Sequence, residues 1–308
     1  MAALKSRMNA EPSTSQLPER IADCVQDVLG ARPISTRRVS HQGCTPTERF
    51  VVALPDGATA FIKAAVSERT AGDLRREHFI YTQVRGPFMP QFLGWRDDGA
   101  LPILLIENLE DAFWPPPWTR GHIETVQRTL SQVAATPAPP GLDSLETVRD
   151  ELSGWRRVAD DPRPFLSLQL CSARWLEAAL PALLAASDAA VLEGDALLHI
   201  DVRSDNLCLR NEQAALIDWN HAARGNALVD VVGWLPSLHD EGGPAPDEIV
   251  GDEGADITAL LTGYFASRAG LPPVSDAPRV RPLQLRQLAV ALPWAARVLS
   301  LPPPDVGT

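Results

Sequence analysis

The amino-acid sequence predicts an α+β protein of two lobes, an antiparallel sheet with one main helix followed by a mostly helical lobe. Two patterns support this expectation. Short apolar runs separated by turn residues dominate residues 18–108, whereas helical periodicity dominates residues 109–308. A proline-rich segment at 114–118, with the sequence WPPPW, marks the boundary region between the two patterns. A chain of 308 residues is long enough for both lobes.

The first lobe is expected to begin after a flexible tail at residues 1–17, which are small and polar. Apolar residues at helical spacing over 18–29 predict a helix that ends at Gly30. Five strands are expected to form the sheet, at residues 34–39, 50–54, 58–65, 91–96 and 101–107. The turn sequences PDG at 55–57 and DDG at 97–99 support hairpins.

A buried charge pair is expected between this sheet and its main helix. Glu77 shares a helical face with Leu74, Tyr81 and Val84, so its carboxylate points at the sheet. A carboxylate in that position needs a partner, and Lys63 of the third strand is the candidate. The alternative is a glutamate on a solvent-facing helix surface.

Helices are expected in the second lobe at residues 119–135, 145–158, 168–186, 231–238, 257–268 and 283–299, with a kink at Pro181. The segment 240–256 is acidic and contains no lysine or arginine. A run of this kind is usually a solvated loop. The alternative is an acidic rim that binds a cationic substrate.

Two short apolar runs in the second lobe each lead to an aspartate. Residues 196–198 precede Asp201, and residues 214–217 precede Asp218. Asn206 follows Asp201 by five residues. One carboxylate and one amide oxygen suffice to hold Mg²⁺ when nucleotide phosphates supply further ligands. The first aspartate then remains available to act on a hydroxyl group.

This stretch resembles the catalytic loop of the protein-kinase-like superfamily, in which His-Arg-Asp-x-x-x-x-Asn is followed by a metal-binding aspartate. The closer resemblance is to the aminoglycoside phosphotransferase branch of small-molecule kinases. The matching residues are His199-Ile200-Asp201, Asn206, Asp218-Trp219-Asn220 and Asp230.

The resemblance implies a protein-kinase-like fold and the roles of individual residues. Asp201 would be the catalytic base or hydroxyl-orienting group, and Arg203 would offer a cation to the transferred phosphoryl group. Asn206 and Asp218 would hold Mg²⁺, with ATP or GTP as the phosphoryl donor. His199 and Asp230 would support the loop structurally.

The resemblance also implies a nucleotide site in the first lobe. Lys63 would contact the phosphates and Glu77 would position it. The loop over the phosphates would contain Ser40 and Gly43, although this chain has one glycine where protein kinases have three. Backbone groups at Glu107 and Leu109 would bind the base.

The acceptor is expected to be a small hydroxylated molecule, because too few residues separate Asp218 from Asp230 for the activation segment of a protein kinase. The first prediction is an antibiotic, either an aminoglycoside or another hydroxylated drug such as a nucleoside, whose phosphorylation gives resistance. The metabolic alternative is a choline-like or amino-sugar alcohol. Candidate acceptor contacts are Asp240, Glu241 and Trp234.

Two alternatives belong to other classes of protein. One is a nucleotide-binding pseudokinase, which the full set of catalytic residues disfavours. The other is a metal-dependent hydrolase built on His199, Asp201 and Asp218, for which His221 is the nearest further ligand.

Charge and composition restrict the partners. A formal net charge of -11 disfavours nucleic acid and anionic membranes and suits a cationic ligand. The 4 cysteines are far apart in sequence, which fits neither a disulfide framework nor a zinc site. No apolar stretch approaches the roughly 20 residues that span a bilayer. We expect a cytoplasmic monomer or homodimer.

Overall fold

The computed structural model describes residues 17–39 and 46–305. These residues form two compact units. Unit 1 contains the described residues up to Arg85 together with Pro90–Asp111, and unit 2 contains Gly86–Met89 and the chain from Ala112 onward. The predicted boundary at residue 108 thus lies close to the end of unit 1. The expected N-terminal tail falls outside the described residues except for Leu17.

Unit 1 is built on an antiparallel sheet of five strands in the order β1-β2-β3-β5-β4. The strands are β1 (Ser35–Arg38), β2 (Glu48–Ala53), β3 (Thr59–Ala64), β4 (Phe92–Arg96) and β5 (Ile103–Glu107). Each predicted strand is present, with ends that differ from the prediction by at most two residues. The edge strand β4 shifts register against β5 between Phe92 and Gly94.

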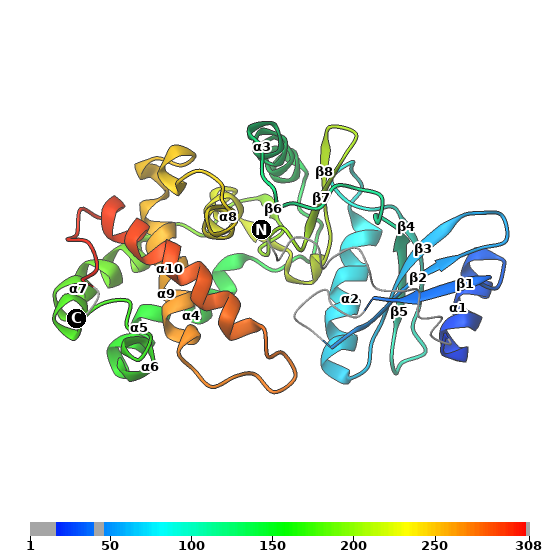
Figure 1. Ribbon diagram of the computed structural model, residues 1–308, viewed down its shortest axis with the longest axis horizontal. Coiled ribbons are helices and arrows are strands. Elements are labelled where there is room, and N and C mark those ends of the chain that lie inside the picture. Colours follow the sequence, from blue (N-terminus) through cyan, green and yellow to red (C-terminus); the bar gives the residue numbers. More distant parts are fainter. Residues whose placement is uncertain (1–16, 40–45, 306–308) are drawn as a thin grey trace. The chain divides into compact units, whose positions relative to one another are not determined.

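Two helices cover the opposite faces of this sheet, as Figure 1 shows. Helix α1 (Glu19–Leu29) packs its apolar stripe on the face that contains Ile62, and it ends at Gly30 in the left-handed conformation (φ 80°). Helix α2 (Glu68–Gln83) begins with a capping box between Ser67 and Thr70. Because side chains alternate along a strand, the neighbour of Ile62 in β3, Lys63, faces α2.

Unit 2 contains two short antiparallel ribbons. In one, β6 (Ala196–Leu198) pairs with β9 (Ala223–Gly225), and in the other, β7 (Leu207–Arg210) pairs with β8 (Gln213–Leu216). Residues 199–206 connect β6 to β7. The loop with the predicted catalytic residues is therefore held at both ends by a strand pair.

Helices make up the rest of unit 2. They are α3 (Arg120–Ala135), α4 (Arg149–Leu152), α5 (Gly154–Asp160), α6 (Arg163–Leu166), α7 (Ala173–Ala189), α8 (Leu228–Asp240), α9 (Ala255–Ala269) and α10 (Val280–Val298). Short 3-10 turns lie at Leu145–Val148, Trp219–His221, Pro246–Glu248 and Asp252–Gly254. The main apolar core of the unit lies among α5, α7, α9 and α10. No helix within the described ranges is long and apolar enough to cross a membrane.

Two helix predictions were wrong in detail. The helix expected at 145–158 is interrupted at Ser153 (ψ 62°), which separates α4 from α5. The helix expected from residue 168 starts at Ala173, because Gln169 is left-handed (φ 57°) and the Ser172 side chain caps α7.

Candidate active site

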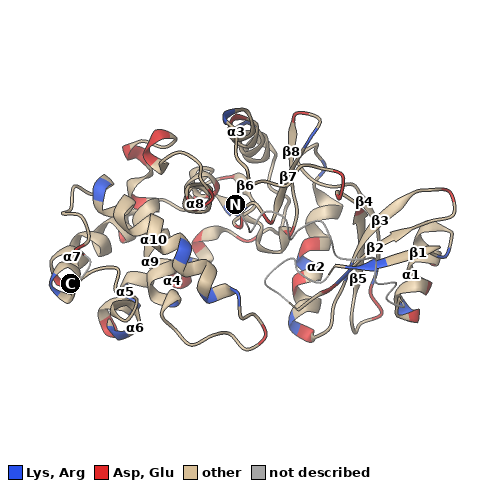
Figure 2. Cartoon of the chain, viewed as in Figure 1, with Lys and Arg blue, Asp and Glu red and all other residues tan. Residues whose placement is uncertain are grey.

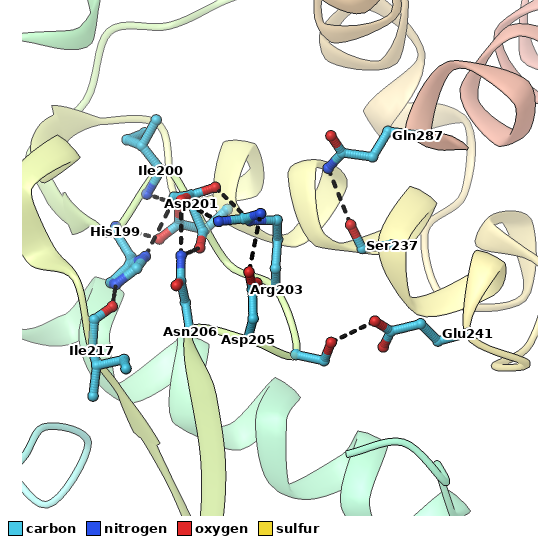
Figure 3. A network of polar contacts seen from close by, with 12 residues as sticks. His199, Ile200, Asp201, Arg203, Asp205, Asn206, Ile217, Ser237, Glu241 and Gln287 are labelled. Carbon is cyan, nitrogen blue, oxygen red and sulfur yellow. Dashed lines mark hydrogen bonds and ion pairs between the residues drawn. The ribbon is translucent and has the colours of Figure 1, made fainter. Parts of the chain in front are cut away.

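Asp201 lies at the centre of a network of hydrogen bonds in the β6–β7 loop (Figure 3). Its Oδ1 atom pairs with Nε of Arg203 at 2.8 Å, and its Oδ2 atom accepts from Nη2 of Arg203 at 2.9 Å. The side-chain amide of Asn206 donates to the same Oδ2 at 2.8 Å and to the Asp201 carbonyl at 2.9 Å. The carboxylate is therefore fixed in one orientation, with its side chain 33% exposed.

The charge of this carboxylate is stabilised. Burial raises the pKa of Asp201, but the Arg203 guanidinium and other nearby groups outweigh it and hold the pKa below its ordinary value. Arg203 also pairs with Asp205 at 3.4 Å and is nearly buried. It was predicted to serve the phosphoryl group, yet here it binds two carboxylates. These contacts hold Asp201 in its orientation, and the role of Arg203 toward the phosphoryl group stays a prediction.

The neutral imidazole ring of His199 supports the β6–β7 loop by hydrogen bonds to its backbone and to residue Ile217 after β8. It is fully buried, and burial lowers its pKa to about 4. Nε2 lies 2.8 Å from the carbonyl of Ile217, and Nδ1 lies 3.3 Å from the backbone N–H of Asp201. Because a carbonyl only accepts and an N–H only donates, we assign the proton to Nε2. A histidine in this state links the loop to the end of β8.

Asp230, in the first turn of α8, binds the backbone of the same loop. Its two oxygens accept the N–H groups of His199 and Ile200, each at 2.7 Å. Burial raises the pKa of Asp230 to about 6, although these two hydrogen bonds lower it. The carboxylate thus fixes the backbone immediately before Asp201.

Strained backbone marks the two positions beside this network. Ile200 has φ 69° and Asp218 has φ 63°, a left-handed conformation that is costly for a β-branched residue such as isoleucine. Asp218 follows β8, and its neighbour Ile217 donates its N–H to the carbonyl of Asn206 at 2.9 Å. The charge of Asp218 contributes to the raised pKa of Asp205. Asp218 therefore lies beside the loop of residues 199–206, which we call the catalytic loop after its predicted role.

The donor set at this point suits a hard cation. The side-chain amide nitrogen of Asn206 is directed at Asp201, so the side-chain oxygen Oδ1 of Asn206 is the atom that could bind a metal. Asp218 adds a carboxylate. No group of three or more His, Cys, Asp or Glu side chains that could hold a metal is found in residues 17–39 and 46–305.

Within unit 1, Lys63 and Glu77 form the expected pair. Nζ of Lys63 lies 2.7 Å from Oε1 of Glu77, and the side chains are only 2% and 3% exposed. An ion pair this deeply buried is rarely justified by stability alone. Its burial indicates that the lysine is held in a set position.

The other predicted nucleotide contacts receive less support. Ser40 and Gly43 lie outside the described residues. The backbone N–H of Glu107 donates to the carbonyl of Gln91 at 2.8 Å, so in this structure it links the end of β5 to the residue before β4. Leu109 is buried, with 8% exposure.

Among the predicted acceptor contacts, Trp234 is a correction. Its side chain is fully buried, as is that of Trp219, so it presents no face on which an acceptor could stack. Asp240 points to Arg286 of α10 at 3.1 Å, and Asp247 pairs with Arg297 of the same helix at 2.7 Å. Part of the acidic segment thus pairs with arginines of α10. The acidic residues of this segment are red in Figure 2.

Glu241 takes a different direction from its neighbour Asp240. Its carboxylate accepts from the hydroxyl of Ser204 in the catalytic loop and from Nε1 of Trp118 at 2.9 Å. Sequence reasoning missed Ser204 and Asp205 in the loop and the role of Trp118. The one available signal was that Ser204 and Asp205 stand between Asp201 and Asn206.

The oriented aspartate, the amide and carboxylate ligand set, and the buried lysine pair are features of the kinase-like phosphotransferases. The sequence matches the model of the phosphotransferase enzyme family over residues 43–268, more than half of the chain, and the protein belongs to this family. It is a phosphotransferase that acts on hydroxyl acceptors.

Solved structures with the same fold include a spectinomycin phosphotransferase in complex with ADP and spectinomycin, with 11% identity, 89% of this chain and 94% of that chain covered, and a TM-score of 0.57. An amicoumacin kinase with AMP-PNP and Ca²⁺ has 9% identity, coverage of 88% and 92%, and a TM-score of 0.56. A Thermobifida fusca protein assigned as a fructosamine-3-kinase has 19% identity, coverage of 90% and 99%, and a TM-score of 0.54. No curated protein sequence matches the chain. The family resemblance and the fold class predicted from the sequence are confirmed.

Proposed function

We propose that this protein, with Mg²⁺ as cofactor, transfers the γ-phosphoryl group of ATP or GTP to a hydroxyl group of a small cationic antibiotic. The observation that carries the proposal is the fixed carboxylate of Asp201, held by Arg203 and Asn206 at 2.8 to 2.9 Å. Family membership supplies the reaction class.

Asp201 would accept a hydrogen bond from the acceptor hydroxyl and aim its oxygen at the phosphoryl group. Its lowered pKa keeps it ionised at neutral pH and makes it a weak base. Phosphoryl transfer needs little covalent help, so orientation accounts for most of its contribution. The hydroxyl proton would pass to Asp201 late, when the new P–O bond is largely formed and the bond from the γ-phosphorus to the nucleoside diphosphate, the leaving group, is largely broken.

Asn206 and Asp218 would hold the metal. When bound, Mg²⁺ would neutralise charge on the nucleotide phosphates. The left-handed backbone of Asp218 would direct its carboxylate, and the hydrogen bond from Asn206 to Asp201 would tie the metal ligand to the acceptor-binding group.

Lys63, held by Glu77, would bind the nucleotide phosphates in unit 1. A lysine fixed by a buried carboxylate loses little side-chain entropy on binding, and its charge offsets that of the phosphates. This proposal rests on the resemblance of the chain to its family and on the burial of the pair.

A cationic acceptor is favoured by the carboxylates at the catalytic loop. Asp205 is exposed beside Arg203, and the chain carries a formal net charge of -11. Relatives in fold include kinases named for the antibiotics spectinomycin and amicoumacin. A choline or ethanolamine kinase family protein of the same fold, with a TM-score of 0.52, supports the second candidate, a choline-like or amino-sugar alcohol.

The proposal is tested by incubating the protein with ATP or GTP, Mg²⁺ and one acceptor at a time. The panel contains aminoglycosides, neutral nucleoside antibiotics, choline and amino sugars, and products are detected by mass spectrometry. We expect one phosphoryl group on a cationic antibiotic, with a KM that rises with salt. A phosphorylated amino alcohol instead would establish the second candidate. Transfer only to a neutral acceptor would overturn the proposed charge preference.

A further inference from the structure

Helix α8 contacts the catalytic loop at both of its ends. Asp230 in its first turn accepts the N–H groups of His199 and Ile200, and Glu241 at its C-terminal cap accepts from Ser204. These two carboxylates lie about three turns apart, at roughly 3.6 residues per turn, so they share one face of the helix. The loop is thus held on either side of Asp201.

The contacts of Glu241 use both of its oxygens. Oε1 binds the hydroxyl of Ser204, and Oε2 accepts from the indole of Trp118 at 2.9 Å. The Trp118 ring in turn packs edge-on against Trp234 of α8, with 5.8 Å between ring centroids. Three segments that are distant in sequence therefore meet at one side chain.

The helix that presents Glu241 is itself anchored. Ser237, one turn before Glu241, accepts from the buried side chain of Gln287 in α10 at 3.0 Å, as Figure 3 shows. Asp240 binds Arg286 of the same helix. The buried hydrogen bond between Gln287 and Ser237 fixes the C-terminal end of α8, so Glu241 reaches the loop from a rigid support. The surface pair of Asp240 and Arg286 contributes little to it.

We propose that Glu241 is a positioning residue, which fixes the catalytic loop through Ser204 and orients Trp118, rather than a residue that binds the charge of the acceptor. Each carboxylate oxygen of Glu241 is held by a donor of the protein, Ser204 or Trp118, so the direction of the carboxylate is set by these contacts, and an ammonium group would have to compete for its remaining lone pairs. The kinetic part of this inference rests on the proposed phosphoryl transfer.

Two substitutions separate the two roles. In Glu241→Gln the amide oxygen can still accept from Trp118 and the amide nitrogen can donate to the Ser204 hydroxyl, so the geometry is kept and the charge is lost. In Glu241→Ala both hydrogen bonds are lost. Asp240→Asn is the matched control, since it removes the adjacent carboxylate that faces Arg286.

The first measurement is hydrogen exchange of the backbone amides in a peptide covering residues 201–209, in the full-length protein. We expect Glu241→Ala to exchange faster by about tenfold, because the loop loses one of its supports. Glu241→Gln and Asp240→Asn should exchange like the parent protein. Ser204→Ala removes the same hydrogen bond from the side of the loop and should also exchange about tenfold faster than the parent protein. It keeps the inference testable if Glu241→Ala folds poorly.

The second measurement is the steady-state kinetics of transfer to an acceptor found in the panel. Glu241→Ala should lower kcat on the order of ten- to a hundredfold with little change in the KM of the acceptor, and Glu241→Gln should restore kcat. A rise in acceptor KM shared by Glu241→Gln and Glu241→Ala, with kcat unchanged, would overturn the inference. So would unchanged exchange in both Glu241→Ala and Ser204→Ala. An absence of transfer by the parent protein would instead refute the proposed function, while the exchange result would still decide the role of Glu241.

Discussion

Replacing Asp201 by asparagine is expected to slow phosphoryl transfer strongly and to destabilise unit 2, although the two side chains have the same shape. In the parent protein Oδ1 of Asp201 forms an ion pair with Nε of Arg203, and Oδ2 accepts hydrogen bonds from Arg203 and Asn206. An asparagine must place its own NH₂ group against one of these nitrogen groups, whichever way the amide turns. At least one contact with the charged guanidinium is therefore lost.

The size of the effect follows from that geometry. The cheaper orientation puts the amide nitrogen at the Oδ1 position, where the ion pair with Nε of Arg203 is lost, and losing a contact with a charged group costs about 1.5–3 kcal/mol. Because the Asp201 side chain is 33% exposed, water compensates in part and we expect about 1–2 kcal/mol. The transfer rate should fall by about 10²–10⁴, the range for a side chain that acts on the transferred proton or hydroxyl.

Three assays on purified Asp201→Asn check these values. Urea denaturation measures the free energy of unfolding, calorimetry measures the affinity for ATP with Mg²⁺, and mass spectrometry measures transfer. Asp205→Asn is the control, because Asp205 is exposed and pairs with Arg203 at 3.4 Å, a longer distance than the 2.8 Å of the pair with Asp201. Nucleotide affinity should stay within about twofold in both variants, since we propose that Asp201 contacts the acceptor and not the nucleotide. Loss of nucleotide affinity in Asp201→Asn would mean that its role and that of Asp218 are exchanged.

Three further predictions concern stability and pH. Glu77→Ala should destabilise unit 1 by about 3–5 kcal/mol in urea unfolding, because it removes the buried carboxylate that lies 2.7 Å from Nζ of Lys63, and Glu77→Leu with Lys63→Met should recover much of that loss. Because the pKa of Asp230 is raised from 3.8 to about 6 in the folded protein, its contribution to stability is fully present below pH 3.8 and is lost as pH rises through 6. Asp230→Asn should remove this component from the pH dependence of the unfolding free energy, and an unchanged profile would refute the assignment. Gly154→Ala should lower Tm by several degrees, because its Cβ would lie 1.8 Å from a backbone oxygen of α9, whereas Gly233→Ala in α8 has room and should be neutral or stabilising.

Sequence reasoning reached the features that depend on spacing within one element or one loop. The five strands follow from short apolar runs between turn residues, and the pairing of Lys63 with Glu77 follows from a charge placed on an apolar helix face. The link from Asp201 to Asn206 follows from five residues of loop. In each case the physical cause is local, so a single sequence contains it.

The features that were missed depend on contacts between distant segments. Nothing in the sequence near Glu241 shows that Ser204 and Trp118 come to its carboxylate, whereas Asp240 beside it turns to α10. Trp234 could not be recognised as buried, because its burial depends on the packing of Trp118 and of the neighbouring helices. The four positions Asp230, Trp234, Ser237 and Glu241 do recur at helical spacing, and that pattern was the available signal for a helix face that supports the loop.

The most direct test of the account follows the γ-phosphoryl group itself. The protein is incubated with γ-labelled ATP, Mg²⁺ and the acceptor panel, and the label is traced to acceptor, to free phosphate or to unreacted nucleotide. We predict label on an acceptor hydroxyl in amounts equal to the ADP formed, with transfer by Asp201→Asn slower by about 10²–10⁴. Bound nucleotide with no label on any acceptor, and with equal release of free phosphate by the parent protein and Asp201→Asn, would contradict it.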